Sequence, residues 1–100
     1  MIKPTVHDRY AHQTGRLFED FVVGDIYHHL PGRTISQNDN AWFTLLTMNT
    51  HPLHFDEEYA AATEFGRPLV ASPLTVAIVV GMSVSDVSAT AIANLGWKEI

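Results

Sequence analysis

The stretch "NTHPLHFDEEYA", residues 49–60, holds the side chains of this 100-residue chain that are best suited to chemistry. Two histidines, His51 and His54, lie three residues apart around a proline, and an acidic patch follows them. They could bind a metal ion with Asp56 or Glu57 as a third ligand, but the proline prevents a regular helix from aligning both rings. A second interpretation is a corner between two helices that carries surface histidines.

The third interpretation is a general base. Histidine has the side chain whose unperturbed pKa lies nearest neutrality, and in His54 it follows a proline that restricts the backbone. Asn49 stands five residues earlier, at the end of an expected helix. A histidine and an amide held across a tight turn could grip one water molecule between them, which is the geometry that a hydration reaction needs.

A second candidate site is "PLVASPLT", residues 68–75. Ser72 is suited to cap a helix, and Pro73 is suited to its first position, so we expect a helix to begin here. Its unpaired N–H groups could form an oxyanion hole for a thioester or carbonyl oxygen. Capping alone would also explain Ser72. The neighbouring Arg67 is either a surface turn residue or a contact for an anion.

The helices that position these residues are predicted by local signals. Ser36, followed by Asp39, predicts the start of a helix over about residues 37–48, with Pro52 as its stop. Residues 56–65, "DEEYAAATEF", predict a second, short helix with acids in its first turn, where they favour the helix dipole.

The helix expected over residues 73–85 is apolar on almost every face, which is typical of a buried helix that other elements wrap. Alternating and β-branched residues predict a strand over residues 26–36, interrupted at Pro31. A further strand is predicted over residues 89–100. The pattern therefore favours an α+β domain whose sheet covers the apolar helix.

Composition limits the function. One hundred residues suggest one domain, and residues 1–16 resemble an irregular arm that leads into a domain over residues 17–100. Six Lys and Arg against eleven Asp and Glu give a net charge of −5, which argues against a nucleic-acid partner. The chain has no cysteine, which fits a cytoplasmic protein. Its most apolar window, residues 73–82, is too short to cross a membrane.

The stretch "TMNTHPLHFDEEYAAATEFGRPLVASPLTVAIVVGM", residues 47–82, resembles the signature of the MaoC-like, (R)-specific enoyl-CoA hydratases. The resemblance extends from about Phe18 to the C-terminus. It implies a hot-dog fold, an antiparallel sheet wrapped round a central helix, of which we expect this chain to hold only the N-terminal part. Such a fragment is expected to be unstable alone or to pair with another chain, and the family implies a homodimer or a higher homo-oligomer.

By this resemblance the catalytic histidine of the family falls on His54, its catalytic aspartate on Asn49 and its motif asparagine on His51. The usual His-Gly-Met before the central helix is replaced by residues 71–73, so the oxyanion N–H would be that of Ser72. The family therefore implies that His54, Asn49 and Ser72 are catalytic. It also implies that substrate is bound by His51, Arg67 and Ala71.

The activity implied is reversible hydration and dehydration of a 2-enoyl-CoA thioester, with no metal or redox cofactor. "GRTIS…DNAWFTLLTMNTHPLHFD" is similar to the branch that acts on branched, carboxylated acyl-CoAs such as mesaconyl-CoA and methylmalyl-CoA. Asn49 in place of the aspartate leaves an alternative open, a non-catalytic module that binds acyl-CoA or a protein. A hot-dog thioesterase is disfavoured because its usual helix carboxylate is missing.

Overall fold

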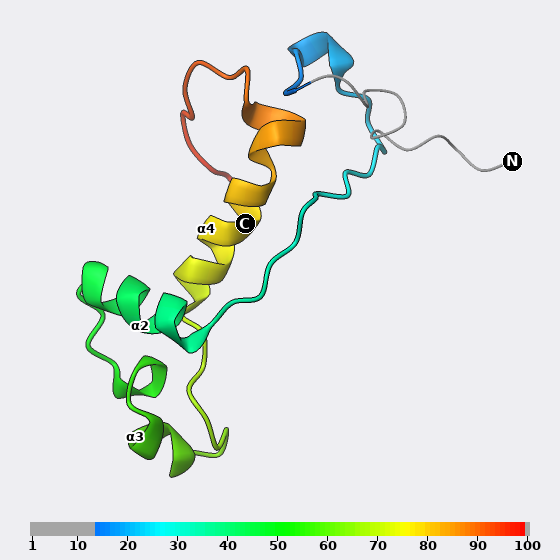
Figure 1. The fold of residues 1–100 in the computed structure, drawn as a ribbon. Coiled ribbons are helices and arrows are strands. Elements are labelled where there is room, and N and C mark those ends of the chain that lie inside the picture. The colour runs from blue at the N-terminus through cyan, green and yellow to red at the C-terminus, as the bar shows by residue number, and fades with distance from the viewer. Residues whose placement is uncertain (1–13, 100) are drawn as a thin grey trace, which may run out of the picture. The chain divides into compact units, whose positions relative to one another are not determined.

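The computed structural model describes residues 14–99, which divide into two compact units (Figure 1). Unit 1 consists of residues 14–32 and 79–99, and unit 2 consists of residues 33–78. All regular elements of the described residues are helical: η1 (Phe18–Asp20), α2 (Gln37–Leu46), η2 (Pro52–His54), α3 (Glu57–Ala61), α4 (Ser72–Met82) and the π-helical turn η3 (Val84–Ser88).

The predicted α+β hot-dog fold is wrong for the part of the chain that the structure describes, which has no β-strand. Residues 26–36 and 89–99, where strands were expected, exchange no backbone hydrogen bonds with another extended segment of the described chain. Alternating residues show that a segment can form a strand, but a strand also requires a neighbour that satisfies its N–H and C=O groups.

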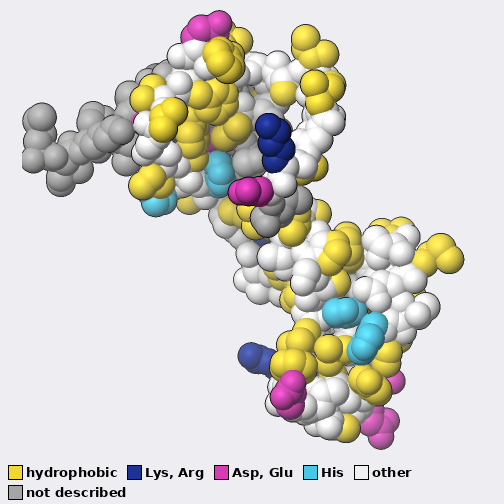
Figure 2. Space-filling view, turned by 180° about the vertical axis from the view of Figure 1, so that it is seen from behind, with side chains coloured by type: hydrophobic (Ala, Val, Ile, Leu, Met, Phe, Trp, Pro, Cys, Tyr) yellow, Lys and Arg dark blue, Asp and Glu magenta, His cyan; other side chains and the backbone are white. Residues whose placement is uncertain are grey.

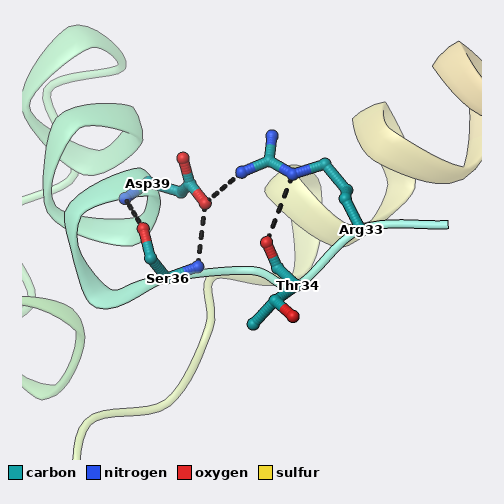
Figure 3. A network of polar contacts seen from close by, with 4 residues as sticks. All are labelled: Arg33, Thr34, Ser36 and Asp39. Atoms are coloured by element: carbon teal, nitrogen blue, oxygen red, sulfur yellow. Dashed lines mark hydrogen bonds and ion pairs between the residues drawn. The ribbon is translucent and has the colours of Figure 1, made fainter.

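The predicted start of α2 is confirmed. The Ser36 hydroxyl accepts a hydrogen bond from the Asp39 N–H at 3.2 Å, and the Asp39 carboxylate accepts one from the Ser36 N–H at 2.8 Å (Figure 3). The Arg33 guanidinium donates to the same carboxylate oxygen. This reciprocal capping box satisfies N–H groups that a helix start otherwise leaves unpaired.

We predict that Asp39 titrates below its ordinary pKa of 3.8, because the Ser36 N–H and then the Arg33 guanidinium stabilise its charged form. A lowered pKa in the folded state means that the stabilisation by Asp39 is present above pH 3.8 and is lost as the pH falls through the folded value. The carboxyl ¹³C shift of Asp39 measures this directly. Arg33→Gln should raise the midpoint, and a wild-type midpoint at or above 3.8 would contradict the capping geometry.

The end of α2 fixes the position of Asn49. The Asn49 N–H donates to the Thr44 carbonyl at 2.9 Å and the Met48 N–H donates to the Leu45 carbonyl at 3.3 Å, which together form a Schellman motif. Met48 takes the left-handed conformation, with φ of 59°, that glycine usually supplies. The helix therefore ends at this motif, well before Pro52, and the prediction that Pro52 stops it is wrong.

The predicted short helix is confirmed as α3, although it is shorter than expected. The Asp56 carboxylate caps it by accepting the Tyr59 N–H at 3.0 Å, and Glu57 and Glu58 lie in its first turn. These acids lie at the positive end of the helix dipole, as the sequence indicated.

The helix α4 exists as predicted, but it is not buried as predicted. Leu74 is its one buried residue in the described structure, and Val79 remains 57% exposed. The physical reason is the missing sheet, since no strand of the described residues covers the helix. Hydrophobic side chains accordingly lie on the visible surface (Figure 2). None of the helices within residues 14–99 has the length and apolar character needed to cross a lipid bilayer.

Unit 1 is held by contacts between residues far apart in the chain. The Gly15 N–H donates to the Ser85 carbonyl at 2.7 Å, and a Cβ on Gly15 would lie 2.9 Å from Thr90, so this approach requires glycine. His29 Nδ1 lies 2.9 Å from the Asp86 carboxylate. This pair joins a residue of the expected first strand to η3.

Candidate active site

All the site residues predicted from the sequence lie in unit 2: Asn49, His51, His54, Arg67, Ala71 and Ser72. They come from the end of α2, from η2 and from the segment of residues 62–72 that leads into α4. The structure of unit 2 therefore shows which of these residues lie close together.

His54, the last residue of η2, has its protonation pattern set by the backbone. Its Nδ1 lies 2.8 Å from the Leu69 carbonyl oxygen, which can only accept a hydrogen bond. Nδ1 must therefore carry the proton, and the lone pair of the neutral ring lies on Nε2. The Leu69 N–H also donates to the Leu53 carbonyl at 3.2 Å, which ties this segment to η2. His54 thus presents a half-buried, oriented proton acceptor.

His51 shows the opposite pattern. Its Nδ1 accepts a hydrogen bond from the Leu53 N–H at 3.2 Å, so the ring proton lies on Nε2 when the ring is neutral. The centroids of the His51 and His54 rings are 5.9 Å apart, and the ring planes are inclined by 57°. One ring can therefore accept a proton while its neighbour donates a hydrogen bond.

Asn49 is bonded to His51. Its side-chain Oδ1 accepts the His51 N–H at 3.0 Å, which leaves the Nδ2 protons available to a ligand. The described residues show no hydrogen bond between the side chains of Asn49 and His54, so the water held between them remains a prediction. The Schellman motif and this turn together fix the Asn49 backbone.

The start of α4 differs from the prediction by one residue. Ser72 is the first helical residue, and it is the Ala71 carbonyl that accepts the Leu74 N–H at 2.9 Å. The Ala71 N–H donates at 3.0 Å to the Asn40 side chain, and Ala71 is only 1% exposed. Among the described residues the Ser72 N–H has no acceptor, so it is the first N–H at this end of α4 that can donate to a ligand.

Asn40 is a central residue that the sequence analysis missed. It lies in α2 and is fully buried. Its Nδ2 donates to the carbonyls of His54 at 2.9 Å and of Leu69 at 2.8 Å, and its Oδ1 accepts the Ala71 N–H. The available signal was weak: Asn40 and Thr44 are polar residues one helical turn apart, and both prove fully buried, whereas Trp42 is 65% exposed.

Arg67 is exposed and lies on a groove of about 530 Å³. The groove is lined by Ile35, Ser36, Gln37, Glu57, Arg67, Pro68, Leu69 and Val70. Two of these residues contact His54, since the Leu69 carbonyl meets its ring and Gln37 Nε2 donates to its carbonyl at 2.8 Å. The guanidinium of Arg67 is thus available for an anionic group near the His54 network.

The metal interpretation gains no support from the part of the chain that the structure describes, which contains no group of three His, Asp or Glu side chains placed to hold an ion. The arrangement is instead that of an oriented imidazole base beside hydrogen-bond donors.

Comparison with known proteins gives the family. The family model described as "MaoC like domain" matches residues 20–100. Mesaconyl-CoA hydratase of Cereibacter sphaeroides is 34% identical over 85 residues, which are 85% of this chain and 25% of that protein. Beta-methylmalyl-CoA dehydratase of Chloroflexus aurantiacus is 37% identical over 83 residues, which are 83% of this chain and 24% of that protein. The chain thus spans about a quarter of the length of these curated relatives, and no solved structure matches it.

Proposed function

Since the chain belongs to the MaoC-like domain family, we propose that it catalyses the reversible hydration of a 2-enoyl-CoA thioester. The observation that carries the proposal is the hydrogen bond from His54 Nδ1 to the Leu69 carbonyl, which places a free lone pair on Nε2. A neutral imidazole with one fixed tautomer is suited to take a proton from water near neutral pH. The hydratase and dehydratase names of the two relatives support the same reaction type.

In the proposed reaction, His54 Nε2 takes one proton from a water molecule while the water oxygen forms a bond to carbon 3 of the enoyl group. The electron pair of the carbon–carbon double bond moves toward the thioester, whose oxygen gains negative charge. The His54 imidazolium then returns the proton to carbon 2, so one water is added and the enzyme is regenerated. Dehydration follows the same steps in reverse.

Three further groups complete this mechanism. The Ser72 N–H at the start of α4 donates to the thioester oxygen, where charge develops, and the dipole of α4 adds to the stabilisation. Asn49 positions the water by donating from Nδ2, because its Oδ1 already accepts the His51 N–H. His51 Nε2–H is available as a donor to the substrate.

For the substrate we propose a branched or carboxylated 2-enoyl-CoA of the mesaconyl-CoA type. The support is the names of the two relatives together with Arg67, whose exposed guanidinium on the groove can pair with a carboxylate or phosphate. We also propose a cytoplasmic homodimer or higher homo-oligomer. The absence of cysteine from the sequence and the many exposed hydrophobic side chains support these two assignments.

The proposal is tested by following the loss of enoyl-thioester absorbance when mesaconyl-CoA or a straight-chain 2-enoyl-CoA is added to the purified protein. Hydration dependent on the protein is expected. Binding of acyl-CoA without turnover, measured by calorimetry, would instead support the alternative of a non-catalytic binding module, which the replacement of the family aspartate by Asn49 suggested.

Asn49→Ala is expected to lower the hydration rate, because the donor that positions the water is lost. Asn49→Asp should leave the rate within about tenfold of wild type or raise it, because a carboxylate can orient the water and accept its proton. Both variants keep the Schellman motif, which uses only backbone groups. An Asn49→Ala protein as active as wild type would remove Asn49 from the mechanism.

A further inference from the structure

We infer that Asn40 is a positioning residue for this reaction, one that holds both the His54 base and the backbone beside the Ser72 N–H. The inference rests on the proposed function. Asn40 touches no reacting atom, and it acts through the three backbone groups that its side chain binds.

The first of its effects concerns the tautomer of His54. The Leu69 carbonyl accepts from His54 Nδ1 at 2.8 Å and from Asn40 Nδ2 at 2.8 Å, so the amide anchors the group that orients the ring. The second Nδ2 proton binds the carbonyl of His54 itself at 2.9 Å. Asn40 therefore fixes both the backbone of His54 and the acceptor of its ring proton.

The second effect concerns the start of α4. Asn40 Oδ1 accepts the Ala71 N–H at 3.0 Å, directly before Ser72 in the chain. One rigid side chain thus spans segments that lie 14, 29 and 31 residues away along the sequence. A displacement of about 1 Å at a catalytic group can cost on the order of 10²-fold in rate, so such an anchor has a measurable effect on catalysis.

An amide is the chemical group that this position requires. Its two N–H donors meet two carbonyls, and its oxygen meets an N–H, so each contact has the correct polarity. An aspartate carboxylate would direct an oxygen at both carbonyls. Alanine would leave the Ala71 N–H unpaired and would remove one of the two hydrogen bonds that each carbonyl accepts. Asn40 is fully buried, so water does not readily replace the lost bonds.

The test compares Asn40→Asp and Asn40→Ala with Thr44→Val. Thr44 is equally buried one turn further along α2, and its hydroxyl donates to the Ala41 carbonyl at 2.9 Å. Loss of this hydroxyl therefore measures the effect of disturbing the same helix face, because it removes no hydrogen bond of the His54 network. Imidazole ¹⁵N and ¹³C shifts report the His54 tautomer without substrate, and kinetics report kcat and KM separately.

We expect the wild-type protein to hold His54 as the Nδ1–H tautomer and the Asn40 variants to show a mixture of tautomers. Their kcat should fall ~10–100-fold with KM little changed, whereas Thr44→Val should keep both the tautomer and kcat. Folded Asn40 variants with a wild-type tautomer and kcat would overturn the inference. A change in tautomer without any hydratase activity in wild type would count against the proposed function and not against the role of Asn40 in orienting His54.

If the Asn40 variants do not fold, two measurements on the wild-type protein test the inference. A scalar coupling across the hydrogen bond between the Ala71 amide nitrogen and the Asn40 side-chain carbonyl carbon, together with the Nδ1–H tautomer of His54, would support the inference. The absence of that coupling, or an Nε2–H tautomer, would overturn it.

Discussion

His54→Ala is expected to hydrate 2-enoyl-CoA ~10²–10⁴-fold more slowly than the wild-type protein, because it removes the group that takes and returns the proton. Binding of the substrate should change little, since His54 acts on the water and on carbon 2. In this variant the Leu69 carbonyl loses the hydrogen bond from the His54 ring but keeps the one from Asn40, so the local fold should persist. Steady-state kinetics together with circular dichroism would measure both effects.

Two histidine variants serve as controls for this experiment. His28 is exposed in unit 1, and His28→Ala should retain the wild-type rate. His51→Ala removes a donor to the substrate and is expected to raise KM more than it lowers kcat. If His54→Ala kept a near-normal rate, or if His51→Ala lost the larger share of kcat, the assignment of the base to His54 would be wrong.

Ser72→Pro is expected to lower kcat by ~10²–10³-fold, because proline has no N–H to donate to the thioester oxygen. Ser72 is the first residue of α4, and the first helical position is the one that tolerates proline best. The Asn40 bond to the Ala71 N–H is not directly removed. The variant therefore deletes one backbone donor with little expected change to the helix.

Ser72→Ala is the matched control, since it removes the hydroxyl and keeps the N–H. It should retain kcat, and circular dichroism should show the same helix content in both variants. A Ser72→Pro protein that folds and turns over normally would exclude the Ser72 N–H from stabilisation of the oxyanion. Equal losses in the two variants would assign the effect to the hydroxyl.

The features predicted correctly from sequence are those that depend on near neighbours. The capping box joins Ser36 to Asp39, and Glu57 and Glu58 lie in the first turn of the helix α3 that they favour, so both signals are visible in a short window. The end of α2 was predicted within two residues, but its cause was not. Met48 takes a left-handed conformation that glycine usually supplies, so nothing in the sequence indicated it, and Pro52 was the visible helix breaker.

The other failures involve partners that are distant in the sequence. Strand propensity in residues 26–36 does not show whether another segment pairs with it, and an apolar helix such as α4 does not show whether a sheet covers it. The role of Asn40 could not be predicted from the sequence, because its side chain forms three hydrogen bonds to segments that are distant in the sequence and lie beside it only in the folded chain. The tautomers of His51 and His54 are likewise set by backbone groups that composition cannot reveal.

The most direct test of the central claim is hydration in ¹⁸O-labelled water, with mass spectrometry of the CoA thioester product. The proposed reaction forms the new carbon–oxygen bond from water activated at His54 Nε2, so the product should carry one labelled hydroxyl oxygen on carbon 3. Incorporation should require the protein and should fall with His54→Ala by the same factor as the rate. A protein that binds the thioester but adds no labelled oxygen above the buffer rate would contradict the account.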